Sequence, residues 1–123
     1  MIDFNIKQPM INELRDEKQF ELVKELLLDD EKIEFAFYSI RDKLFITNKR
    51  LIFANVQGIT GKKVEFSTIP LSKIQMFSCE SSGHIDFDSE FDLILANGGI
   101  IKFNLPRSFD IKKVSKFIAE KIL

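Results

Sequence analysis

The chain has few of the residue types that catalytic sites and extracellular folds depend on. It contains one cysteine, one histidine and no tryptophan in 123 residues. The single Cys79 cannot form a disulfide within the chain, which fits a protein kept in a reducing cytosol. Because His84 is the only histidine, no Ser-His-Asp triad is evident, and Cys79 lies in a strand-like run that predicts a buried, inert thiol. We therefore expect a cytoplasmic protein without catalytic residues.

Long apolar runs and a strong net charge are also missing. No apolar segment approaches the ~20 residues that span a bilayer. Met1–Met10 shows no charged region followed by an apolar core, so no signal peptide is expected. Lys and Arg total 18 against 19 Asp and Glu, a net charge of −1, which gives no general attraction to nucleic acid or anionic lipid. We predict no nucleic-acid partner, and membrane contact would need a local basic patch.

One acidic segment has metal-ligating residue types. His84, Asp86, Asp88 and Glu90 share one face of a predicted strand. Alternate residues of a strand lie about 7 Å apart, so one flat strand cannot surround a small cation. No phosphate-cradling Gly-Lys-Ser/Thr loop occurs elsewhere. We interpret the run as a solvated acidic face and predict neither a metal nor a cofactor.

Phenylalanine is abundant: thirteen residues, in a chain that is 45% hydrophobic, predict a packed interior. The length favours one continuous globular unit. Apolar residues at helical spacing between 11 and 28 predict one helix, or two with a break near Asp16, after an arm at 1–10. A second amphipathic helix is predicted from Ser108 or Asp110 to the end of the chain.

Between these helices the chain alternates apolar and polar residues with a period of two, which predicts about seven short strands. Gly58, Gly61 and the Asn97-Gly98-Gly99 run mark hairpin turns. The expected strands are 33–40, 43–47, 50–56, 62–70, 73–80, 84–88 with 90–96, and 100–105. We predict a mainly β (α+β) fold, a small curled sheet or partly open barrel closed at one end by the last helix.

The ordered motifs resemble the bacterial pleckstrin-homology (PH) domain in its small single-domain form. They are Thr47-Asn48-Lys49-Arg50-Leu51, Gly58 with Thr60-Gly61-Lys62-Lys63, Ile69-Pro70 and Asp86-Phe87-Asp88. The resemblance implies a PH-like domain over 31–123, with 1–30 as an N-terminal arm and helical segment. It also implies seven bent antiparallel strands capped by a C-terminal helix, no enzyme activity, and a tendency toward ring-like homo-oligomers.

Two sets of residues are candidates for binding. The first is a set of cations at turns and strand ends, which form either a patch for an anionic ligand or, as the isolated positions favour, separate solvated charges: Arg41, Lys43, Lys49, Arg50, Lys62 and Lys63. The second set, Phe45, Phe53 and Phe77, lies on faces opposite the residues expected in the core. These rings either contact another subunit or pack under the two helices of the same chain.

Two functions follow from these candidates. The first is a non-catalytic module for protein interaction and self-assembly, working as a homo-oligomer whose other protein partners the sequence does not identify. The alternative is a peripheral membrane adaptor that binds anionic lipid headgroups through the turn cations. Salt distinguishes them, because electrostatic binding to a membrane weakens with ionic strength and an apolar oligomer does not.

Overall fold

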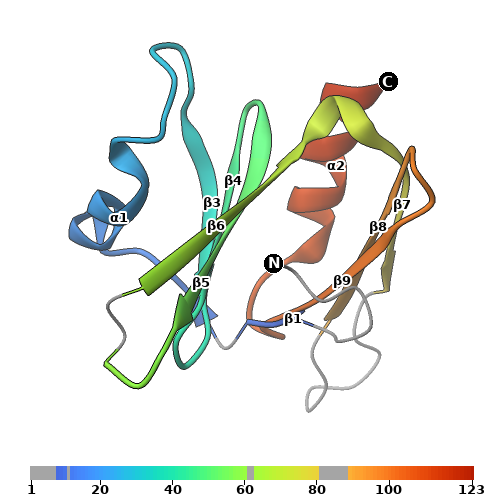
Figure 1. Cartoon of the computed structure of the whole chain (residues 1–123). Coiled ribbons are helices and arrows are strands. Elements are labelled where there is room, and N and C mark those ends of the chain that lie inside the picture. The colour runs from blue at the N-terminus through green and yellow to red at the C-terminus, as the bar shows by residue number, and fades with distance from the viewer. Residues whose placement is uncertain (1–7, 11, 61–62, 81–88) are drawn as a thin grey trace.

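The computed structural model describes residues 8–10, 12–60, 63–80 and 89–123, which form two β-sheets and several helices (Figure 1). The strands are β1 (Gln8–Pro9), β2 (Asn12–Glu13), β3 (Ile33–Tyr38), β4 (Lys43–Thr47), β5 (Arg50–Gln57), β6 (Lys63–Pro70), β7 (Ile74–Glu80), β8 (Ser89–Leu95) and β9 (Ile100–Leu105). The helices are the 3-10 turns η1 (Glu17–Phe20) and η2 (Leu71–Lys73), and the α-helices α1 (Glu21–Lys24) and α2 (Ile111–Ile122).

One sheet has the strand order β2-β3-β4-β5-β6 and the other has the order β1-β9-β8-β7. All neighbouring strands are antiparallel except β1 and β9. The chain passes from one sheet to the other through η2, and α2 lies between the two sheets (Figure 1). The predicted PH-like arrangement of bent antiparallel strands with a C-terminal helix is confirmed. The strand predicted at 84–88 lies outside the described residues.

The main core fills the space between the two sheets and α2. Phe37 and Phe53 from the five-stranded sheet, and Phe91 and Phe103 from the four-stranded sheet, are all fully buried there. Helix α2 begins with a cap in which the Asp110 carboxylate accepts the Lys112 N–H, and it turns its apolar face inward. The buried residues of that face are Ile111, Val114 and Ile118.

A second, smaller core covers the outer face of the five-stranded sheet. Val23 of α1 is fully buried there together with Phe45 and Ile52. The ring of Phe20 meets that of Phe45 edge to face, with centroids 5.9 Å apart. The middle strands β4 and β5 are therefore buried on both faces, and α1 lies on the outside of the sheet (Figure 1).

The N-terminal segment differs from its prediction as an arm followed by a helix over 11–28. Residues 12–13 form a strand, and the helical part is limited to η1 and the single turn of α1. The Met10 N–H donates to the Asn104 carbonyl of β9 (2.7 Å), and the Leu14 N–H donates to the Ala36 carbonyl of β3 (2.8 Å). Long-range backbone bonds to both sheets therefore replace helical bonds, and this segment connects β9 of one sheet with β3 of the other.

Candidate functional site

The structure places five of the six candidate cations, and it divides them between opposite ends of β4. Arg41, Lys43 and Lys63 lie at the end that carries the β3–β4 and β5–β6 turns, while Lys49 and Arg50 lie at the β4–β5 turn. Lys62 is outside the described residues. Because β4 is five residues long, roughly 16 Å separate the two ends, so these cations do not converge on one ligand.

At the β4–β5 turn, Arg50 is committed to contacts within the chain. Its Nε donates to Glu31 Oε2 (2.9 Å) and its Nη2 to Glu31 Oε1 (3.0 Å), a bidentate ion pair. Nη2 also donates to the Leu26 carbonyl (2.6 Å), and Nη1 donates to Thr68 Oγ1 (3.1 Å). The guanidinium is thus occupied by internal acceptors, so we exclude Arg50 from any surface patch for anions.

The carboxylate of Glu31 is the least exposed member of this network, with a side chain 0% accessible to solvent. Burial by itself raises its pKa. Hydrogen bonds from Arg50, the Thr47 hydroxyl (2.6 Å) and the Leu28 N–H (3.1 Å), together with the charge of Arg50, outweigh burial. They lower the pKa of Glu31 from its ordinary 4.5 to about 2, so Glu31 is ionised at neutral pH.

Two further residues of the Thr47-Asn48-Lys49-Arg50 motif bind the same segment. Asn48 accepts the Lys32 N–H (2.7 Å) and donates to the Asp30 carbonyl (3.0 Å). Lys49 forms an ion pair with the Asp30 carboxylate (3.1 Å). We call this set of contacts between 26–32 and 47–50 the clasp. The sequence placed these cations at a turn, but it did not identify Glu31 as the partner of Arg50. The signal that could have shown this is an acid just before a predicted strand that is followed by a Thr-Asn-Lys-Arg turn.

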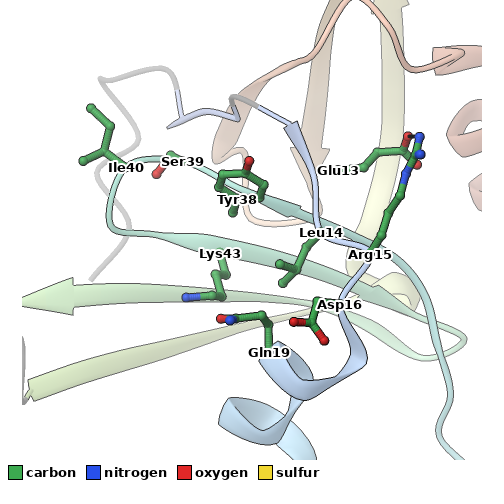
Figure 2. A pocket seen from close by; sticks show the side chains of 9 residues that line it. All are labelled: Glu13, Leu14, Arg15, Asp16, Gln19, Tyr38, Ser39, Ile40 and Lys43. Atoms are coloured by element: carbon green, nitrogen blue, oxygen red, sulfur yellow. Dashed lines mark hydrogen bonds and ion pairs between the residues drawn. The ribbon is translucent and has the colours of Figure 1, made fainter.

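The other end of the sheet holds a surface pocket of about 410 Å³ between the N-terminal segment and the β3–β4 turn (Figure 2). Two of its acids are engaged: the Glu13 carboxylate accepts from Arg15 (2.8 Å) and Asp16 accepts the Lys18 N–H (3.0 Å). Lys43 has no ion pair among the described residues, and it lies with Gln19 and Asp16 around the pocket. The full lining is Glu13, Leu14, Arg15, Asp16, Gln19, Tyr38, Ser39, Ile40 and Lys43.

The three candidate aromatic residues pack within the chain. Phe45 is buried under the N-terminal segment, and Phe53 is buried in the main core beside Phe103, with centroids 6.2 Å apart. Phe77 is half-buried and faces Phe91 across β7 and β8, with centroids 6.4 Å apart. Phe45 and Phe53 therefore offer no exposed ring to another subunit in this structure.

The outer face of the four-stranded sheet carries an exposed apolar row that the sequence analysis did not single out. Cross-strand pairing aligns Met76 of β7 with Ile94 of β8, and Ile94 with Ile100 of β9. Met76 is 55% exposed and Ile100 is 42% exposed. A bulge between Ile74 and Met76 shifts the alternation of β7, which turns Met76 outward and Phe77 toward the core.

The remaining candidates for chemistry are Cys79 and the acidic run of His84, Asp86, Asp88 and Glu90. Cys79 is half-buried, and its burial, together with the negative charge of Asp92, raises the pKa of the thiol above its usual range. His84, Asp86 and Asp88 lie outside the described residues. In the ranges that the structure covers, no group of three or more metal-ligating side chains occurs, and no helix is long and apolar enough to cross a membrane.

Two facing antiparallel sheets with a C-terminal helix between them define a protein of the PH-fold class. The model of the bacterial PH domain family matches residues 5–122, and the chain belongs to that family. It is 43% identical over 94 residues to the uncharacterized protein YjqA of Bacillus subtilis (strain 168), a match covering 72% of this chain and 75% of the relative.

Solved structures of bacterial PH-domain proteins share the fold. A DUF1696-family protein with a pleckstrin-homology domain from Shewanella loihica PV-4 is 31% identical, with a TM-score of 0.79 over 91% of this chain and 97% of that chain. A pleckstrin-homology domain from Shewanella amazonensis SB2B is 33% identical, with a TM-score of 0.67 over 91% of each chain. At 20% identity, a PH-domain protein from Exiguobacterium sibiricum 255-15 shows the fold alone (TM-score 0.63, 92% of this chain and 59% of that one).

Proposed function

We propose that this bacterial PH domain is a non-catalytic module for protein interaction that assembles with further copies of itself. One observation carries the proposal: each sheet ends in a long strand whose outer edge has no partner strand among the described residues. These strands are β6 in the five-stranded sheet and β7 in the four-stranded sheet. An unpaired edge offers backbone N–H and C=O groups to a strand of another chain.

The β7 edge is the better candidate for the contact. Exposed edges are commonly protected by charged side chains or proline, yet β7 carries no charge from Ile74 to Cys79. The apolar row of Met76, Ile94 and Ile100 adjoins this edge and would be covered by a neighbouring subunit. Contact between β7 of one copy and β6 of the next would be heterologous, and such contacts close into rings when the rotation permits.

Light scattering coupled to size exclusion at micromolar concentration tests the proposal. We expect a mass that is a multiple of 14.3 kDa for the native chain, and a shift toward 14.3 kDa for Met76→Lys. Ile40→Ser, which changes an exposed isoleucine at the end of the other sheet, is the matched control and should keep the native mass. A native chain that runs only as a 14.3 kDa species would refute self-assembly.

A further inference from the structure

The surface pocket of about 410 Å³ has walls from two separate parts of the chain (Figure 2). Strand pairing places Tyr38 of β3 opposite Lys43 of β4, and both side chains line the pocket. The Leu14 N–H donates to the Ala36 carbonyl of β3 (2.8 Å), which fixes the N-terminal segment against the sheet. One wall is therefore the β3–β4 hairpin, and the other wall belongs to residues 13–19.

Some polar groups of the lining are already satisfied within the chain. The Glu13 carboxylate accepts from the Arg15 guanidinium (2.8 Å), so these two charges neutralise each other. The Ser39 hydroxyl accepts the Asp42 N–H (3.1 Å) in the β3–β4 turn. A ligand would have to break an internal contact to use any of these groups, so they do not select what the pocket binds.

Three other polar side chains of the lining keep unused binding capacity. Within the described part of the chain, the Lys43 ammonium and the Gln19 amide have no hydrogen-bond or ion-pair partner. Asp16 accepts the Lys18 N–H through Oδ1 (3.0 Å), and its Oδ2 has no partner among those residues. In Figure 2 the Gln19 side chain lies between Lys43 and Asp16. The pocket therefore offers one positive and one negative group with an amide between them.

This pairing of charges selects the class of ligand. A simple anion would be attracted by Lys43 but repelled by Asp16, and a simple cation would meet the reverse. A small molecule that carries both a carboxylate and an ammonium satisfies both groups. The volume falls within the roughly 300–1,000 Å³ of pockets that hold small organic molecules. Leu14 and the ring of Tyr38 add apolar surface to the lining.

We propose that this pocket binds a free α-amino acid with an apolar side chain. Lys43 and the Gln19 amide donate to its carboxylate, while its ammonium donates to Asp16 Oδ2. Its side chain lies against Leu14 and Tyr38. The site is on the five-stranded sheet and the β7 edge is on the other, so binding of the amino acid does not depend on self-assembly.

Titration of the full chain with L-leucine tests the proposal, followed at each backbone amide by two-dimensional NMR near neutral pH and at low salt. We expect saturable shifts at Asp16, Gln19 and Lys43, with a dissociation constant on the order of 1 mM, because charged contacts in an open pocket are weak. N-acetyl-L-leucine lacks the ammonium and L-leucinamide lacks the carboxylate, so each should bind about fivefold more weakly. Glycine, which has no side chain to lie against Leu14, should bind about threefold more weakly.

Variants of the two charged residues test the same contacts from the protein side. Lys43→Gln and Asp16→Asn should each weaken L-leucine binding about fivefold. Asparagine can still accept the Lys18 N–H, so Asp16→Asn keeps the cap of η1. Lys113→Gln and Asp29→Asn make the same chemical changes at exposed residues outside the pocket, and both should bind as the native chain does.

Three results would overturn the proposal. The first is no shift at the pocket amides in about 20 mM L-leucine, well above the expected dissociation constant. The second is equal binding of L-leucine, N-acetyl-L-leucine and L-leucinamide, since the two charges of the ligand would then not matter. The third is native affinity in both Lys43→Gln and Asp16→Asn. Unchanged spectra away from the pocket will show that both variants remain folded.

Discussion

Replacing Glu31 with glutamine tests whether the clasp stabilises the fold through a buried charge. Glutamine keeps the size of the side chain and can still accept a hydrogen bond, but it carries no charge. The Arg50 guanidinium, whose side chain is 19% exposed, would then be nearly buried without a counter-charge. Removing one member of a buried ion pair is strongly destabilising because the other charge is left uncompensated.

The size of the effect follows from the pKa of Glu31. A fall from 4.5 in the unfolded chain to about 2 in the folded chain corresponds to about 3 kcal/mol of the free energy of unfolding. Because the folded-state pKa is the lower one, this stabilisation is complete above about pH 5 and disappears as pH falls through 4.5 toward about 2. Glu31→Gln should therefore be about 3 kcal/mol less stable at pH 7, with the difference reduced to about half near pH 3.

Urea denaturation followed by circular dichroism at pH 7, 5, 4 and 3 measures this difference. Glu21→Gln is the matched control, since Glu21 forms an exposed ion pair with Lys24 (2.6 Å). An exposed pair contributes less than about 1 kcal/mol, so the control should track the native chain at every pH. A difference between native and Glu31→Gln that stays constant from pH 7 to pH 3 would show that the ionised carboxylate is not what stabilises the clasp.

Two further predictions concern the clasp and the second core around Phe45. Combining Glu31→Gln with Arg50→Met should destabilise less than the sum of the single changes, by about 1 kcal/mol or more, because no unpaired charge remains; a double-mutant cycle measures this, and strict additivity would contradict it. Phe45→Ala should cost about 3–5 kcal/mol in chemical denaturation, since it opens a cavity beneath Phe20 in the second core. A cost below about 1 kcal/mol would mean that the N-terminal segment does not pack on that ring.

The β-rich part of the fold could be predicted from the sequence because its signals are local. Period-two alternation identified β3, β4, β5, β6, β7 and β9 within about two residues, and Asn97-Gly98 marked a hairpin in which Gly98 has the positive φ of 90° that glycine favours. The helical segment predicted over 11–28 is present but shorter, from Glu17 to Lys24, because apolar spacing of three and four also arises where an irregular segment covers a sheet. Pairing of residues 12–13 with β3 is a long-range contact that no local pattern contains.

The candidate site was harder to predict from the sequence, because it also depends on long-range contacts. The sequence places Lys49 and Arg50 at a turn, but whether a turn cation faces solvent depends on the residue that folds against it. Glu31 lies 19 positions before Arg50 and is brought to it by the pairing of β3 with β4. Alternation in β4 likewise indicates a single buried face, although the N-terminal segment buries the other face, and Phe45 with it.

This double burial restricts where partners can bind. The N-terminal segment covers the outer face of β4 and β5, and the main core covers their inner face. The buried middle of the five-stranded sheet therefore offers neither face to a partner. The exposed apolar side chains of the sheets and their turns lie instead at the β3–β4 and β5–β6 turns and on the outside of the four-stranded sheet. These places are on different sheets, so Met76→Lys on the four-stranded sheet should change the oligomeric mass, whereas Ile40→Ser in the β3–β4 turn should leave it unchanged.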